Sequence, residues 1–173
     1  MRKITLIVCL ILICTASPSG AGEDSSLFAK GKKFARSNET EFAYMQFRDI
    51  INNFPNSIHR EHALFATGEY YASIPDHEET KRIFNQFLIE YPESKSKIFV
   101  LAYLYKMAEV DGDTEQIEKL KTDIIRIQQV GFVFRNSKEL KYQSPLAHHY
   151  RAVIQIDRIL IEKEGETLVE LSY

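Results

Sequence analysis

The stretch Leu27–Ser57 reads LFAKGKKFARSNETEFAYMQFRDIINNFPNS, and the stretch Leu64–Ser94 reads LFATGEYYASIPDHEETKRIFNQFLIEYPES. The second stretch starts 37 residues after the first, and the two share nine identical residues in 31 aligned positions. The identical pairs are Leu27/Leu64, Phe28/Phe65, Ala29/Ala66, Gly31/Gly68, Ala35/Ala72, Glu41/Glu78, Phe47/Phe84, Pro55/Pro92 and Ser57/Ser94. Self-similarity at this period predicts stacked copies of one supersecondary unit.

Each copy has the pattern of two helices. In the first copy, Leu27 and Gly31 lie four residues apart on one face of a helix. A second apolar helix follows and ends before Pro55, because proline lacks an amide proton and disfavours a helical residue before it. The second copy ends in the same way before Pro92. Gly31 and Gly68 predict a close contact between the two helices of each copy, since a larger side chain would hold them apart.

The spacing of large, small, aromatic and proline residues resembles the tetratricopeptide repeat. The matching positions are Leu27, Gly31, Phe34, Ala43, Phe47 and Pro55 in the first copy, and Leu64, Gly68, Tyr71, Thr80, Phe84 and Pro92 in the second. Thr80 departs from the pattern, which has alanine there. The long period and the phrases Phe-Pro-Asn-Ser and Tyr-Pro-Glu-Ser look like the repeats of the BamD family of outer-membrane assembly lipoproteins and of the periplasmic Tol-Pal cell-division coordinators. The resemblance implies an all-α fold, a short right-handed solenoid.

A third, degenerate copy is expected after the second. Helices are predicted over Lys97–Val110 and Thr114–Val130, although Tyr105 stands where the repeat has glycine. Residues 22–130 therefore form the repeat region. Loss of the consensus is expected in a terminal unit that packs on something other than a further repeat.

Residues 131–173 are predicted to be a C-terminal capping segment. Ser144 and Pro145 suit a helix start, so a capping helix is expected over residues 145–163 and Gly165 ends it. A small hairpin between Phe132–Phe134 and Thr167–Tyr173 is a further expectation.

The first 21 residues have the pattern of a secretory signal peptide. Met1-Arg2-Lys3 is positive, Ile4–Cys14 is an apolar run of 11 residues, and small residues follow up to Ala21. Cleavage after Ala21 leaves 173 − 21 = 152 residues for an exported protein of the periplasm or outer membrane. Lipidation at Cys14 is the alternative, although the bulky Ile13 departs from the usual pattern.

Composition and motifs exclude several functional classes. Removal of two cations takes the formal charge from −2 to −4, which disfavours a nucleic-acid partner. Both cysteines lie in the signal segment, so the remaining chain has no thiol nucleophile. His59 and His62 lie too close for the metalloprotease spacing, and neither a Gly-x-Ser-x-Gly motif nor a glycine-rich phosphate loop occurs. We expect no enzymatic activity, no metal and no cofactor.

The resemblance implies a partner-binding groove lined by the first helix of each pair. Its expected residues are Phe28, Lys32, Arg36, His62, Phe65, Glu69, Phe99, Lys106 and Glu109. The three phenylalanines among them could instead pack between repeats. The cations Lys32, Arg36 and Lys106 suit an acidic partner.

The sequence therefore predicts a non-enzymatic scaffold of the bacterial periplasm or outer membrane that binds a peptide or helix of a cell-envelope protein. The alternative is a fixed structural subunit of an outer-membrane protein assembly complex. No small-molecule substrate is indicated, and membrane contact is expected only through a lipidated Cys14 or through a partner.

Overall fold

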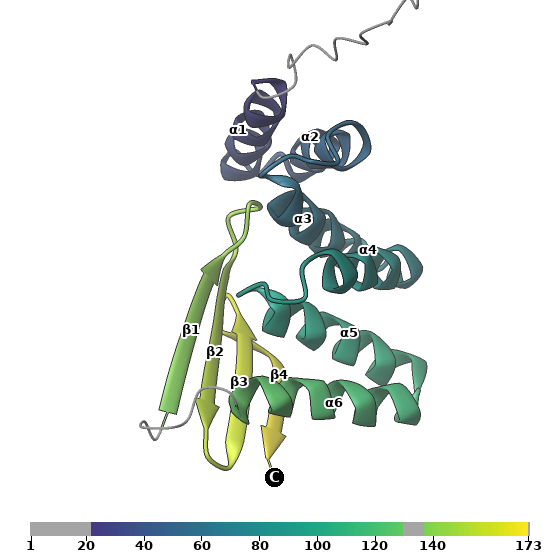
Figure 1. Cartoon of the computed structure of the whole chain (residues 1–173), viewed down its shortest axis with the longest axis vertical. Coiled ribbons are helices and arrows are strands. Elements are labelled where there is room, and N and C mark those ends of the chain that lie inside the picture. Colours follow the sequence, from purple (N-terminus) through teal and green to yellow (C-terminus); the bar gives the residue numbers. More distant parts are fainter. Residues whose placement is uncertain (1–21, 130–136, 173) are drawn as a thin grey trace, which may run out of the picture.

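The computed structural model describes residues 22–129 and 137–172, and the first of these ranges forms three helix pairs (Figure 1). The helices are α1 (Glu23–Arg36), α2 (Thr40–Asn53), α3 (Arg60–Ser73), α4 (His77–Glu90), α5 (Lys97–Asp111) and α6 (Thr114–Gln129). The first members of the pairs begin at residues 23, 60 and 97, and the second members begin at 40, 77 and 114. Both series advance by 37 residues, so the predicted period is confirmed and extends to the degenerate third copy.

The two glycines lie where the helices of a pair approach each other closely. A Cβ atom built on Gly31 would lie 2.7 Å from Cε1 of Phe47, and one on Gly68 would lie 2.6 Å from Cε1 of Phe84. Both phenylalanine rings are fully buried. The predicted close contact is therefore confirmed, and the second helix of each pair presses an aromatic ring against the backbone of the first.

A hydrogen bond that recurs with the repeat explains the serine in Phe-Pro-Asn-Ser and Tyr-Pro-Glu-Ser. Ser57 Oγ donates to Asp24 at 2.6 Å, and Ser94 Oγ donates to Glu61 at 2.6 Å. Each hydroxyl also accepts a backbone N–H two residues later, at 3.1 Å in both copies. The loop that enters each new pair is thus tied to the first helix of the pair before it.

The C-terminal segment is a β-sheet, so the prediction of an all-α fold is wrong. Its strands are β1 (Ser137–Gln143), β2 (His149–Gln155), β3 (Arg158–Lys163) and β4 (Glu166–Ser172), paired antiparallel in the order β1-β2-β3-β4. The expected capping helix over residues 145–163 is replaced by β2 and β3. Thr167–Tyr173 is mostly strand, but β4 pairs with β3. The expected signal segment and the expected partner Phe132–Phe134 lie outside the described residues.

The buried apolar residues of this segment alternate with more exposed ones along its strands. Tyr150, Ala152 and Ile154 alternate with more exposed neighbours, as do Ile159 and Ile161. Alternation is the signal of a half-buried strand, and β-branched residues favour it. The chain turns between β3 and β4 at Glu164 and Gly165, which have φ values of 50° and 82°. Positive φ at both central residues is the requirement of a type I′ hairpin turn.

One face of the sheet packs against the helices, mainly against α5 (Figure 1). The shared core contains Phe65 and Phe99 from the helices together with Tyr150, Ile154 and Ile161 from the strands. The other face is polar and carries the ion pairs Arg151–Glu139, Arg151–Glu162 and Arg158–Glu170. The sheet therefore covers the side of the second and third helix pairs that was expected to form an open groove.

Candidate partner-binding site

Three of the residues predicted to bind a partner are buried under the sheet. Phe65, Glu69 and Phe99 are all 0% exposed. The Phe65 ring lies edge-on to Tyr142 and Tyr150, with centroid distances of 4.8 and 5.5 Å. The prediction that these residues are available to a partner is wrong, because the C-terminal strands supply their contacts. The alternative, in which the three phenylalanines pack between repeats, fits Phe28, whose ring contacts His59 and His62 of the next repeat. Phe65 and Phe99 pack against tyrosines of the sheet instead.

Glu69 holds the sheet to the helices through a buried polar cluster. His148 Nδ1 lies 2.6 Å from Oε1 of Glu69, Tyr150 donates its hydroxyl to the same oxygen, and Lys163 Nζ lies 3.3 Å away. The hydroxyls of Tyr150 and Tyr103 are 2.7 Å apart. Glu69 Oε2 has no hydrogen-bond partner among the described residues. One carboxylate oxygen on α3 thus receives groups from both β2 and β3 and from the turn before β2.

Opposing effects set the pKa of Glu69. Burial alone would raise the pKa of this carboxyl, but the hydrogen bond from His148, the charge of Lys163 and the hydrogen bond from Tyr150 outweigh it, so the pKa lies below its ordinary value. Burial also raises the pKa of Tyr150 well above its ordinary value, and the nearby carboxylate adds to that effect. The cluster is therefore a carboxylate with neutral tyrosine and cationic lysine partners.

The residues at the same repeat position as Glu69 have different surroundings. Lys32, Glu69 and Lys106 are spaced by 37 residues. Lys106 is exposed and pairs with Glu109 at 3.0 Å, so these two predicted residues contact each other. Lys32 lines an open pocket. The sheet removes the middle position from solvent, while Lys32 in the first pair and Lys106 in the third stay accessible and only Lys32 of the three lines this pocket.

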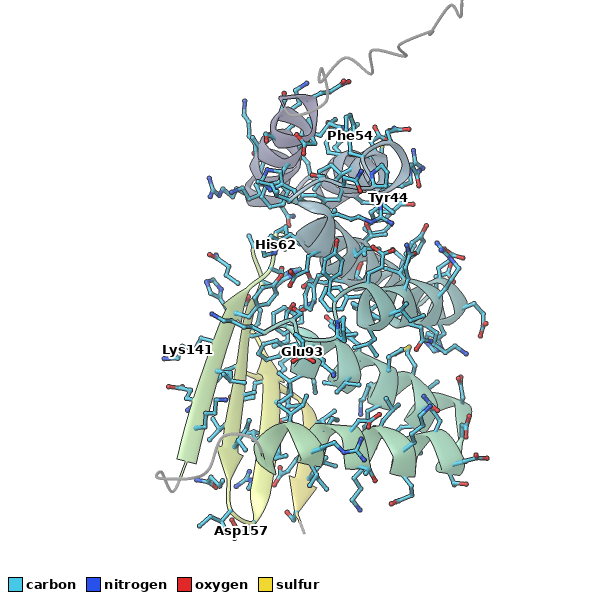
Figure 2. The ribbon with its side chains drawn as sticks, viewed as in Figure 1. Tyr44, Phe54, His62, Glu93, Lys141 and Asp157 are labelled. Carbon is cyan, nitrogen blue, oxygen red and sulfur yellow. The ribbon has the colours of Figure 1, made fainter. Side chains whose placement is uncertain are left out.

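That pocket, hereafter the junction pocket, lies where α1, the start of α3 and the β1–β2 turn meet, and its cavity volume is about 490 Å³. Four of the predicted residues line it: Phe28, Lys32, Arg36 and His62. The remaining lining residues are Ile58, His59, Gln143, Ser144, Pro145 and Ala147. Figure 2 shows His62 at the start of α3, close to the end of the β1–β2 hairpin.

The wall of the junction pocket is organised around an aromatic stack. The rings of Phe28 and His59 are stacked 4.3 Å apart with an interplanar angle of 5°. Lys32 Nζ lies 5.0 Å from the centre of the Phe28 ring, within the range of a cation–π contact. His59 Nε2 is 3.2 Å from the hydroxyl of Ser25. The stack presents a flat, partly apolar surface beside a positive charge.

The fixed charge of the junction pocket is positive. Lys32 and Arg36 lie four residues apart on α1, and neither forms an ion pair with another described residue. Desolvation by the surrounding side chains lowers the pKa of His62, the charges of His59 and Lys32 act in the same direction, and Glu61 opposes them. At neutral pH the two α1 cations therefore supply the charge and the His62 imidazole is neutral.

The β1–β2 turn is anchored firmly enough to form the other wall. Leu146 is 5% exposed and packs with Ala43, Phe47 and Ala63 of the first two helix pairs. Ser144 donates its backbone N–H to the carbonyl of His148 at 2.9 Å. His148 in turn reaches Glu69 on α3. Pro145 and Ala147, which flank Leu146 and form this wall, are thus held in place by the contacts of Leu146 and His148 with the helices.

Sequence reasoning missed the residues that the turn and the start of α3 contribute. Ile58 and His59 lie just before α3, and His59 was considered only as a metal ligand. Pro145 was interpreted as a helix start. The described part of the chain holds no cluster of three or more His, Cys, Asp or Glu side chains suited to a metal ion. The alternation of apolar residues from Tyr150 onward indicates a strand, and a strand that begins there implies a turn just before it.

The sequence matches no protein-family model and no curated protein. Within residues 22–129 and 137–172, no helix has the length and apolar character needed to span a bilayer.

Proposed function

We propose that this chain is a non-enzymatic protein-binding module of the bacterial cell envelope, built on tetratricopeptide-type repeats. It binds a peptide segment of a partner protein at the junction pocket. The observation that carries the proposal is that Lys32 and Arg36, which form no ion pair with another described residue, lie beside the Phe28–His59 stack in an open cavity. Phenylalanine and arginine are both enriched in protein–protein interfaces.

A peptide suits this surface better than a helix lying along the repeats. An α-helix with its side chains is about 10–12 Å across. The sheet occupies the face of α3 and α5 on which such a helix would continue, and Phe65 and Phe99 are fully buried there. The accessible part of the expected groove is the stretch beside α1 and the β1–β2 turn.

Capture from envelope extract tests the proposal. We expect the wild-type chain to retain a partner protein. When both proteins are purified and the measurement is repeated, their binding should be saturable, and Phe28→Asp should abolish it. Ala29→Asp, an exposed change on the same helix, is the control and should bind normally. A partner that stays bound at constant stoichiometry through high salt and is indifferent to Phe28→Asp would favour a fixed structural subunit instead.

Export is part of the same proposal. We expect the natively exported chain to begin within a few residues of Gly22, because the charge, apolar run and small residues before it form a signal peptide. Intact-mass measurement on the natively exported protein decides this. A mass that fits an acylated chain starting at Cys14 would replace the free periplasmic protein with a membrane-anchored one.

A further inference from the structure

The junction pocket carries enough chemistry to define the class of segment that it takes. Its acidic neighbours are already engaged within the fold: the Asp24 carboxylate accepts hydrogen bonds from Ser57 and from Ser25, and Glu61 accepts one from Ser94. Neither acid lines the cavity. Lys32 and Arg36 line the cavity, form no ion pair with another described residue, and are complementary to an anionic ligand.

The same cavity has an apolar side. Ile58 lines it and is 83% exposed, which is high for a large apolar side chain. The Phe28–His59 stack, Pro145 and Ala147 continue this apolar surface. An inorganic anion would leave it uncovered, whereas an apolar side chain in a ligand would remove it from water at a gain of about 25 cal/mol per Å² of buried apolar area.

A ligand with both features must place negative charge and an apolar group close together. An extended peptide does so, because successive side chains point to opposite sides. Lys32 and Arg36 are one helical turn apart on α1 and can meet carboxylates on one side of the segment. Ile58, at the loop before α3, can meet a side chain on the other.

Resting on the proposed function, we infer that the junction pocket binds an extended acidic segment of its protein partner. The carboxylates of that segment lie against Lys32 and Arg36, and one apolar side chain lies against Ile58 and the Phe28–His59 stack. The β1–β2 turn forms a wall of this site, so the C-terminal sheet takes part in recognition as well as covering the remaining helices.

Fluorescence anisotropy with short labelled peptides tests the inference on the full chain. One peptide carries glutamates around a central leucine, the second replaces leucine by serine, and the third replaces the glutamates by lysines. We expect the first to bind, at least about tenfold more tightly than either of the others, with an affinity that falls as salt is added.

Two double variants on α1 separate the pocket from the general charge of the chain. Lys32→Glu with Arg36→Glu should weaken the first peptide by at least about tenfold. Lys30→Glu with Lys33→Glu makes the same change of charge at exposed positions of the same helix that do not line the cavity. The second variant should stay within about twofold of the wild type. Circular dichroism checks that both variants remain folded.

Several outcomes would overturn the inference. These are equal binding of the lysine peptide, equal loss in both double variants, or displacement of the peptide by inorganic phosphate at concentrations that leave ionic strength unchanged, which would mark a small-anion site. If the serine peptide bound as tightly as the leucine peptide, the apolar contact with Ile58 and the Phe28–His59 stack would be refuted. If an envelope partner is captured through Phe28 while none of the peptides binds, the proposed function stands and the inference alone fails.

Discussion

The absence of a side chain on Gly31 lets the ring of Phe47 lie against the backbone of α1. The same arrangement joins Gly68 and Phe84 one repeat later. A β-carbon at either glycine would fall under 3.0 Å from ring atoms that are themselves fully buried. Since protein interiors are close-packed, a ring in this position cannot move aside without disturbing its own neighbours.

Replacing either glycine by leucine should therefore destabilise the fold strongly. Overpacking a well-packed contact costs about 1–3 kcal/mol, and both Gly31→Leu and Gly68→Leu should lose at least this much free energy of unfolding. Chemical denaturation measures it. Ala29→Leu adds bulk to the exposed face of the same helix and should change stability by less than about 0.5 kcal/mol. If both glycine variants unfolded at the same denaturant concentration as the wild type, the helices would not be in close contact.

Among the elements, the helix pairs could be predicted and the strands could not, for one physical reason. The helices repeat, so chance apolar residues in one copy are absent from the other and the shared positions stand out. Residues 137–172 occur once. There, Tyr150, Val153, Ile154 and Ile161 fit helical spacing, while Tyr150, Ala152 and Ile154 fit alternation, and only the contacts with the helices decide between the two. The β1–β2 turn reaches the first helices from far along the chain, so no local pattern places it in the junction pocket.

Adjacent residues of β2 distinguish a strand from a helix experimentally. Ile154 is fully buried on the helix-facing side, while Val153 is half-buried on the polar side. We expect Ile154→Lys to abolish cooperative unfolding, since it buries an unpaired charge, and Val153→Lys to cost less than about 1 kcal/mol. In a helix over residues 145–163, both residues would lie on the buried apolar face. Similar damage from both changes would thus contradict the strand, and thermal melts of the two variants decide it.

At the scale of the whole molecule, Glu69 joins the repeats to the sheet and makes their union depend on pH. Its pKa is lower in the fold than its ordinary value of 4.5. A carboxyl with a depressed pKa contributes stability that is present above the ordinary value and is lost as pH falls through the lowered one. Stability should therefore decline as pH drops from about 5 downward.

Glu69→Gln isolates this contribution. The variant should be less stable at pH 7, by about 3–5 kcal/mol if removing one partner of a buried pair has its usual effect, and its stability should fall less steeply below pH 5. Urea midpoints across this pH range measure both. Glu109→Gln, which removes an exposed carboxylate paired with Lys106, should reproduce the wild-type profile. A Glu69→Gln profile as steep as that of the wild type would assign the acid sensitivity to other carboxylates.

For a partner bound at the junction pocket as proposed, the sheet that fills most of the helical face also sets how long it stays bound. With about 490 Å³ left open at one end, contact is limited to a few side chains of the incoming segment, and differences in affinity between related complexes arise chiefly in the rate of departure. A single such contact has a short residence time. Durable attachment then requires several copies of the chain, or several acidic segments on one partner, acting together through avidity.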